Sequence, residues 1–365
     1  MKILNVVGAR PNFMKIAPIH RCFKKFEDIQ SKIVHTGQHH NQQMSGVFFE
    51  QLELAEPDYF LGINGGSQTE QMTGIMLEFE KILKIEKPDV VLVVGDVTST
   101  IACALAAVHQ KIPVAHVEAG LRSGDMLMPE EINRLMTDRI SDHLFVTEPA
   151  AIENLKLENI GSEKIHFVGN VMIDSLVYNR AKLDEIKILE TLDLQPKSYV
   201  LITMHRPGNV DNEENLKKIL KIVKQLTFEK PVLFPIHPRT LKNIEKYGLS
   251  EEFENISDLQ IVEPQGYLEF LKLLENASLI ITDSGGVQEE STFLRVPCLT
   301  LRENTERPVT VDLGTNYLIG SLETEPVMTL AREILKTGGK RGIIPELWDG
   351  NAAERIVKII REKYI

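Results

Sequence analysis

The first indication of the fold comes from residues 279–290, which read LIITDSGGVQEE. An apolar, β-branched run ends in Asp283, and the small residues after it suit a tight turn that opens a helix. The first half of the chain contains an echo of this stretch at 90–100, which reads VVLVVGDVTST. A buried strand followed by a short turn and a helix is the repeating unit of parallel α/β sheets. The two stretches therefore predict two α/β domains.

Short β-branched runs alternate with helical stretches along the rest of the chain, as parallel sheets require. The expected N-terminal Rossmann-like domain spans 1–172 and the C-terminal one spans 173–351, and an amphipathic helix at 352–365 can dock back on the first. The predicted class is α/β, with two Rossmann-like doubly wound domains facing a cleft. Strands are expected at 3–7, 32–36, 90–94, 114–117, 144–146, 200–203, 232–236, 259–262, 279–282 and 298–301.

The composition excludes several classes of protein. The 365 residues are 43% hydrophobic and 25% charged, which is typical of a globular enzyme and not of a disordered or fibrous chain. No apolar run approaches the roughly 18 residues of a membrane span, and the first strand is too short for a signal peptide. A net charge of −11 disfavours a nucleic-acid binder. Cys22, Cys103 and Cys298 have neither metal nor disulfide spacing, which favours a cytoplasmic protein.

An anion site is indicated at residues 8–11, GARP, directly after the first expected strand. Pro11 suits the first turn of a helix, and Arg10 and Lys15 bring two cations to the positive end of that helix. The alternative is an ordinary pair of surface cations.

A second anion site is indicated at 283–290, where glycines expose backbone N–H groups to a phosphate and Glu290 could accept hydrogen bonds from ribose. Arg307 follows in the next strand-end loop and has the forked geometry that suits a diphosphate. The alternative is an ordinary tight turn. The two anion sites predict a phosphorylated ligand. Because the sequence has no G-x-G-x-x-G, Walker A or metal-binding motif, we expect neither a cofactor nor a metal.

Acidic side chains gather where strands of the first half end. Asp96 follows one strand, His116 and Glu118 lie on the next, and Glu130 and Glu131 open a later helix. Alternate residues of a strand share one face, so we expect His116 and Glu118 to point the same way. Carboxylates at these three positions (Asp96, Glu118 and the adjacent pair at 130–131) fit proton transfer at carbon, which needs a base, an acid and an orienting group. The alternatives are a helix cap for Asp96 and a solvated helical turn for the two later glutamates.

Two histidines occupy similar strand-end positions in the second half. His205 and His237 each follow an expected strand, and either could donate to a phosphate or move a proton. A structural histidine is the alternative. Asp211 and Glu214 have the spacing of a capping box for the next helix.

Eight motifs occur in order along nearly the whole chain: 8–11 with Lys15, 36–39, 95–96, 116–122, 129–134, 205–206, 283–290 and 305–308. Together they resemble those of the non-hydrolysing UDP-N-acetylglucosamine 2-epimerases. The resemblance implies the two-domain glycosyltransferase-B architecture and a cytoplasmic homodimer. It also implies interconversion of UDP-N-acetylglucosamine and UDP-N-acetylmannosamine without NAD or metal.

The resemblance assigns roles to individual residues. A pyranose C2–H has no adjacent carbonyl, so the implied route without NAD is anti elimination of UDP to 2-acetamidoglucal, followed by syn re-addition. The implied catalytic group is Asp96, Glu118, Glu130 and His205, with Lys15 close to the sugar. The implied uridine and diphosphate contacts are Arg10, Gln265, Phe270, Ser284, Gly285, Gly286, Glu290 and Arg307.

The chain also departs from the bacterial pattern of that family. Asn12 replaces a glutamate, and residues 67–69 lack an arginine associated with an allosteric substrate site. The loop before Pro129 is shorter, which leaves the choice between Glu130 and Glu131 open. Three alternative functions remain: a 2-epimerase of a UDP-2,3-diacetamido sugar acid, a UDP-sugar glycosyltransferase, and a non-catalytic nucleotide-sugar sensor.

Overall fold

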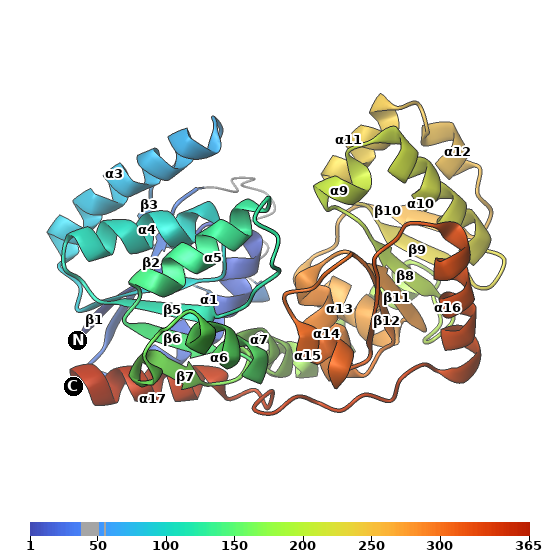
Figure 1. The fold of residues 1–365 in the computed structure, drawn as a ribbon. Coiled ribbons are helices and arrows are strands. Elements are labelled where there is room, and N and C mark those ends of the chain that lie inside the picture. Colours follow the sequence, from blue (N-terminus) through green and yellow to red (C-terminus); the bar gives the residue numbers. More distant parts are fainter. Residues whose placement is uncertain (38–50, 55) are drawn as a thin grey trace. The chain divides into compact units, whose positions relative to one another are not determined.

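The computed structural model describes residues 1–37, 51–54 and 56–365, and only the backbone of Arg10. These residues form two compact units, drawn in Figure 1. Unit 1 comprises Met1–Tyr178 and Glu346–Ile365, and unit 2 comprises Asn179–Pro345. Each unit is a parallel sheet with helices packed against it, which confirms the predicted α/β class of two Rossmann-like domains.

The described residues of unit 1 form a seven-stranded sheet in the order β3-β2-β1-β4-β5-β6-β7. Its strands are β1 (Lys2–Val7), β2 (Gln30–His35), β3 (Tyr59–Phe60), β4 (Val90–Val94), β5 (Val114–Ala119), β6 (His143–Val146) and β7 (Ile165–Phe167). Its helices are α1 (Arg10–Phe23), α3 (Gln68–Glu86), α4 (Thr98–His109), α5 (Pro129–Ile140), α6 (Pro149–Leu157), α7 (Val171–Arg180) and α17 (Ala352–Tyr364).

Unit 2 contains a six-stranded sheet in the order β10-β9-β8-β11-β12-β13. Its strands are β8 (Val200–Thr203), β9 (Val232–Pro235), β10 (Leu259–Val262), β11 (Leu279–Thr282), β12 (Cys298–Leu301) and β13 (Asn316–Ile319). Its helices are α8 (Ile188–Thr191), α9 (Pro207–Val210), α10 (Glu213–Leu226), α11 (Pro238–Lys246), α12 (Ser250–Glu254), α13 (Tyr267–Asn276), α14 (Gly285–Leu294), α15 (Pro308–Asp312) and α16 (Thr324–Thr337).

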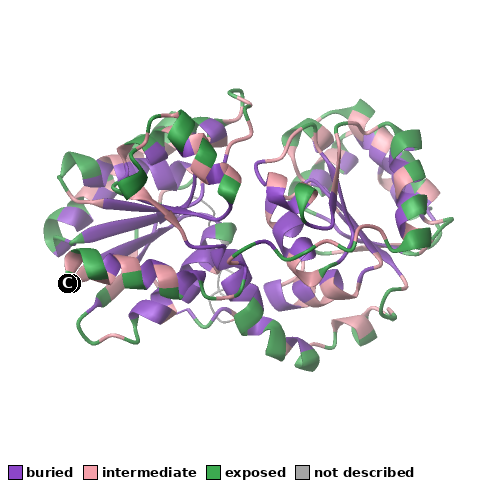
Figure 2. Ribbon diagram, turned by 60° about the horizontal axis from the view of Figure 1, so that its bottom comes forward, coloured by how far each residue is buried: buried purple, intermediate pink, exposed green. Residues whose placement is uncertain are grey.

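Both faces of each sheet are covered, which explains why the strands read as continuous apolar runs. In β8, Val200 and Ile202 pack in the core cluster that includes α10 and α16. Leu201 points the other way, into the cluster that includes residues of α13. Figure 2 shows the buried strands between helices whose outer surfaces are exposed.

The order of the strands locates the candidate site. In each sheet the chain returns from the third strand to the far side of the first, which places β4 beside β1 and β11 beside β8. Ligands of such sheets bind at the carboxyl ends of the strands on either side of this switch point. The loops after β1 and β4, and those after β8 and β11, contain the sequence motifs that predicted a site.

The unit boundaries differ from the expected positions after 172 and 351 because α7 and the segment that leads to α17 pack with unit 1. The Ser175 hydroxyl of α7 donates to the carbonyl of Met14, and Leu176 is fully buried. Trp348 is buried as well, and its indole N–H donates to the carbonyl of Thr147 over 3.1 Å. Helix α17 packs against α1.

The strands expected at 90–94, 200–203, 259–262, 279–282 and 298–301 are found with those bounds. The strands β3, β7 and β13 were missed; β3 and β7 have only two and three residues, and β13 begins with Asn316 and is mostly half-buried. The three cysteines are buried and free, as expected. Among the described residues, no helix has the length and apolarity to cross a bilayer.

Candidate active site

A buried ion pair lies at the carboxyl edge of the unit 1 sheet. Lys15, on the second turn of α1, places Nζ 2.5 Å from Oε2 of Glu118 at the end of β5. The exposed fractions of the two side chains are 7% and 2%. The Lys15 ammonium also comes so close to Gly95 that a Cβ there would lie 3.2 Å from Nζ. The Lys15–Glu118 ion pair therefore lies close to the end of β4, where the loop that contains Asp96 begins.

Glu118 has a backbone conformation that the sequence did not reveal. Its φ is +71°, in the left-handed region, and the pairing of β5 with β6 is irregular between Val117 and Ala119. Such irregularities re-aim side chains near functional sites. The expectation that His116 and Glu118 point the same way was wrong: His116 contacts Asp138 of α5, whereas Glu118 contacts Lys15 of α1.

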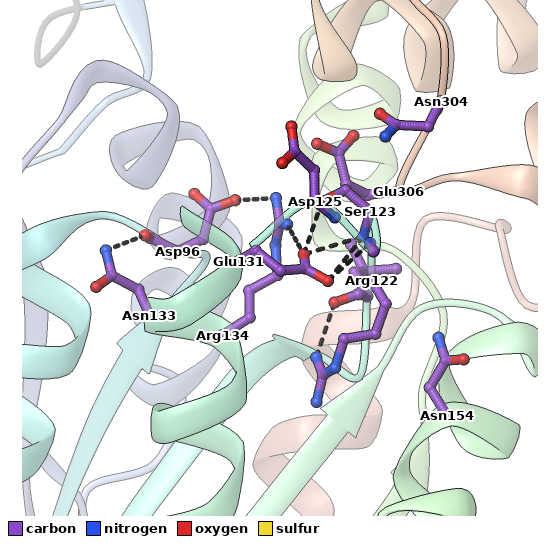
Figure 3. A network of polar contacts seen from close by, with 12 residues as sticks. Asp96, Arg122, Ser123, Asp125, Glu131, Asn133, Arg134, Asn154, Asn304 and Glu306 are labelled. Atoms are coloured by element: carbon purple, nitrogen blue, oxygen red, sulfur yellow. Dashed lines mark hydrogen bonds and ion pairs between the residues drawn. The ribbon is translucent and has the colours of Figure 1, made fainter. Parts of the chain in front are cut away.

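Asp96 is held by residues of α5, as Figure 3 shows. Its Oδ2 lies 2.5 Å from Nη2 of Arg134, and its backbone carbonyl accepts a 2.8 Å hydrogen bond from the amide of Asn133. The alternative role of Asp96 as a helix cap does not fit, because Val97 occupies the N-cap position of α4. Arg134 leaves the Asp96 carboxylate partly exposed and fixed in direction.

Glu130 and Glu131 have different environments, although they are adjacent. The Glu131 carboxylate is buried and accepts hydrogen bonds from the backbone of Ser123 and Gly124, at 2.9 to 3.1 Å, and from Nη1 of Arg134 at 2.8 Å. Burial favours a higher pKa for Glu131, but these contacts outweigh it and lower the pKa. Glu130 is half-exposed, and its side chain makes no hydrogen bond or ion pair with the described residues. Glu131 therefore holds the loop, whereas the Glu130 side chain is left partly exposed.

In unit 2, Asp283 organises the loop that contains His205. The Asp283 carboxylate accepts hydrogen bonds from the backbone N–H of His205 at 3.0 Å and of Arg206 at 2.9 Å. Nδ1 of His205 lies 3.0 Å from Oδ1 of Asp283. Burial favours a higher pKa for Asp283, but the contacts with His205 and the backbone outweigh it and lower the pKa. An ionised Asp283 therefore orients the ring of His205, which is one-third exposed and directs Nε2 away from the carboxylate.

The residues expected to hold a phosphate (the predicted phosphate cradle) lie at the start of α14. Ser284 occupies the N-cap position, and Gly285 and Gly286 open the helix. A Cβ at Gly285 would lie 2.6 Å from Nη1 of Arg307, so this glycine is required for the approach of the guanidinium. Nε of Arg307 lies 2.8 Å from Oε1 of Glu289. Arg307 therefore lies beside the N-terminus of α14, where a diphosphate would combine both attractions.

Glu290 and Tyr267 form a buried polar pair behind this cradle. Burial and the neighbouring Glu289 carboxylate raise the pKa of Glu290 to about 8, although the Tyr267 hydroxyl partly offsets this. Gln265 precedes α13 and its amide donates to the carbonyl of Glu263 over 2.7 Å. Phe270, on α13, packs partly against the core. These residues lie on the loops and helices that follow β10 and β11.

Sequence reasoning missed three partners that hold the predicted residues in place: Arg134 for Asp96, Asp283 for His205, and Asp138 for His116. Of these three partners, only Arg134 had a signal in the sequence: it lies three residues after Glu131 on a helix, a spacing that allows an ion pair. Side chains at Arg10, Gln38 and His39 lie outside the described residues. Over the ranges that the structure covers, no cluster of three His, Cys, Asp or Glu side chains could hold a metal ion.

A family model described as UDP-N-acetylglucosamine 2-epimerase matches residues 21–361. The chain belongs to the UDP-N-acetylglucosamine 2-epimerase family. This result confirms the resemblance drawn from the eight motifs, and the match spans all of unit 2 and most of unit 1.

Relatives in this family match the chain from end to end. The UDP-N-acetylglucosamine 2-epimerase of Methanocaldococcus jannaschii is 44% identical, over 99% of each chain. A crystal structure of the M. jannaschii enzyme, in complex with UDP-GlcNAc and UDP, has a TM-score of 0.92 and covers 99% of this chain and all of its own. The UDP-2,3-diacetamido-2,3-dideoxy-D-glucuronate 2-epimerase of Pseudomonas aeruginosa is 41% identical, over 99% of each chain.

The different environments of the two adjacent glutamates lead to a stability prediction. We expect Glu131→Gln to lower the free energy of unfolding by roughly 1–3 kcal/mol at pH 7, because buried donors lose a charged acceptor. Since the native pKa of Glu131 is lowered, its contribution is present above the ordinary pKa and is lost as the pH falls. Urea unfolding followed by the fluorescence of Trp348, the only tryptophan, measures the change.

The matched control is Glu130→Gln, which should change the free energy of unfolding by less than about 0.5 kcal/mol. An equal loss in both variants would contradict the assignment of Glu131 to the loop and Glu130 to chemistry.

Proposed function

We propose that this chain interconverts UDP-N-acetylglucosamine and UDP-N-acetylmannosamine. The observation that supports this most directly is the combination of a carboxylate group in unit 1 with a phosphate cradle in unit 2. A glycosyltransferase or a sensor would use the cradle but has no need for a set of proton-transfer groups.

The proposed reaction proceeds by elimination and re-addition. The C1–O bond breaks with its electron pair leaving on UDP, a base removes the C2 proton, and a C1=C2 double bond forms in 2-acetamidoglucal. UDP then returns to C1 while a proton is delivered to the opposite face of C2. Because the proton leaves from one face and returns to the other, at least two groups must handle it.

We assign proton transfer at C2 to Asp96, Glu118 and Glu130, with Lys15 beside the sugar. Three observations support the assignment: Glu118 is re-aimed by its left-handed backbone, Asp96 is held in direction by Arg134, and Glu130 is unengaged among the described residues. Fixed direction matters because catalytic groups act only at near-attack geometry.

We assign UDP to residues of unit 2. Ser284, Gly285, Gly286 and Arg307 would hold the diphosphate, and His205 would donate to it as charge develops on the leaving oxygen. Glu290 would accept hydrogen bonds from ribose, with Gln265 and Phe270 near the base. Arg10 is assigned to the diphosphate on sequence alone. The chain's residues alone supply these roles, and the proposal includes neither cofactor nor metal.

A second candidate substrate is a UDP-2,3-diacetamido sugar acid. The chain is 41% identical to the P. aeruginosa epimerase, which is close to the 44% identity to the M. jannaschii enzyme. This similarity makes a UDP-2,3-diacetamido sugar acid a candidate substrate. The chemistry at C2 would be the same. Incubating the protein separately with each nucleotide sugar, without an acceptor, and following epimer formation by NMR distinguishes the two; this also excludes a glycosyltransferase if the epimer forms.

We further propose that the chain is a cytoplasmic homodimer. Four apolar side chains of unit 1 lie exposed in one stretch of chain, which supports burial against a second copy; they are Met126, Leu127, Ile132 and Met136. Three buried, free cysteines support a reducing compartment.

The proposed roles predict which variants lose epimerase activity. Asp96→Asn, Glu118→Gln and Glu130→Gln should each lower kcat by roughly 10²–10⁴-fold, because an amide keeps the shape of the side chain but cannot take a proton. UDP affinity should stay within about threefold of the parent, because the assigned UDP contacts of unit 2 are unchanged. Epimer formation by NMR and UDP titration by calorimetry measure the two quantities.

Two results would count against these roles. A fully active Asp96→Asn protein would remove Asp96 from proton transfer. A matching loss of UDP affinity in all three variants would attribute the lost activity to a disturbed fold and not to proton transfer. The matched control is Arg307→Lys, which should weaken UDP binding more than it lowers kcat, because lysine cannot reproduce the fork.

The raised pKa of Glu290 predicts how UDP affinity depends on pH. In the free protein Glu290 is largely protonated below about pH 8. Ribose hydroxyls donate best to the ionised carboxylate, so UDP binding should release one proton and weaken by up to about tenfold for each pH unit below 8. Calorimetry in two buffers with different ionisation enthalpies measures proton release directly. Glu290→Gln should abolish it, and proton release unchanged in that variant would refute the assignment.

A further inference from the structure

His116 is fully buried at the middle of the unit 1 sheet, and the proposed reaction gives it no role. Its ring lies between two acceptors: Nδ1 is 2.7 Å from Oδ1 of Asp138, and Nε2 is 2.8 Å from the carbonyl oxygen of Gly95. A carbonyl oxygen can only accept, so Nε2 carries a proton.

Asp138, the partner of Nδ1, is itself held by further donors. Asp138 accepts hydrogen bonds from the backbone N–H of Gly120 at 3.0 Å and from Arg122 at 2.7 Å. Burial favours a higher pKa for Asp138, but the contacts with His116 and Arg122 outweigh it and lower the pKa. The ring of His116 is therefore held between the buried Asp138 carboxylate at Nδ1 and the Gly95 carbonyl at Nε2.

The acceptor at Nε2 belongs to the peptide that joins Gly95 to Asp96. Gly95 has a φ of +67°, so the chain turns sharply just before the catalytic candidate. The next peptide is held on its other side, since the carbonyl of Asp96 accepts from Asn133, and the Asp96 side chain is held by Arg134. Both peptides that flank the Asp96 Cα are thus fixed by hydrogen bonds.

We propose that His116 is a positioning residue: its ring, anchored by Asp138, holds the Gly95 carbonyl through Nε2 and so sets the direction of the Asp96 carboxylate. This role rests on the proposed function, because its consequence is a rate of proton transfer at C2. This role explains why the buried polar pair of His116 and Asp138 lies next to the turn that contains Asp96, where an apolar side chain would fill the same space.

Two isosteric substitutions separate positioning from simple packing. The amide of Gln reaches about as far as Nε2 and can still donate to Gly95, whereas the shorter Asn amide replaces Nδ1 and can donate only to Asp138. If Gly95 is the important partner, His116→Asn should lower kcat by about 10²-fold with little change in KM. His116→Gln should lose less than about tenfold. UDP affinity should remain within about twofold in both.

A structural role predicts the opposite order, because the Asn variant keeps the bond to the buried carboxylate. Equal losses in the two variants, or higher activity in His116→Asn, would overturn the proposal. If neither variant folds, Asn133→Ala provides the second arm: release of the Asp96 carbonyl should lower kcat without weakening UDP binding, and unchanged kcat would contradict positioning.

The donor at Nε2 of His116 is tested on the unmodified protein without substrate. In a sample with ¹⁵N-labelled histidine at pH 7, the ring of His116, assigned by its absence in His116→Gln, should show a proton on Nε2. An unprotonated Nε2 would overturn the donor assignment. If the unmodified protein fails to epimerise any nucleotide sugar, the proposed function fails, but this spectrum still decides the state of His116.

Discussion

The parallel pairing of the first and fourth strands in each sheet is the constraint on which the rest of the site depends. Because β4 runs beside β1, and β11 beside β8, loops that are far apart in sequence emerge side by side at one edge. The pairing of Thr203 with Thr282 leads directly to the bonds between Asp283 and the backbone of His205. Without that register, neither the carboxylates nor the phosphate cradle would assemble.

Charge compensation is the second feature common to both units. Lys15 pairs with Glu118, Arg134 lies between Asp96 and Glu131, and Arg307 pairs with Glu289. Buried charges are costly unless paired, so these contacts hold reactive groups in place before a ligand arrives. On the proposed function, a diphosphate that reaches Arg307 would join an existing ion pair, and its binding would redistribute charge within a preformed site. Preorganisation of this kind favours catalysis, because little rearrangement is left for the reaction itself.

The two domains, five strands with their bounds, and the sheet edge at which the motifs gather were predicted from the sequence. Short apolar runs and the residues that follow them are patterns of neighbouring residues, which can be read without knowing the fold. The sequence did not reveal the bulge at Glu118, since a left-handed glutamate has no sequence signature. It placed a capping box at Asp211 and Glu214, whereas Asn212 caps α10 and Asp211 pairs with Arg239. The partners of Asp96, His116 and His205 come from other strands and helices, so only the register of the fold reveals them.

One chemical event is central to the proposed reaction: the C2 proton is lost to a side chain as UDP departs. The most direct measurement is NMR of UDP-N-acetylglucosamine incubated with the protein in D₂O until the epimers equilibrate. Carboxylates exchange protons rapidly with solvent, so we expect deuterium at C2 in both UDP-N-acetylglucosamine and UDP-N-acetylmannosamine. Epimers that form with protium retained at C2 would contradict elimination and re-addition through the carboxylates of unit 1.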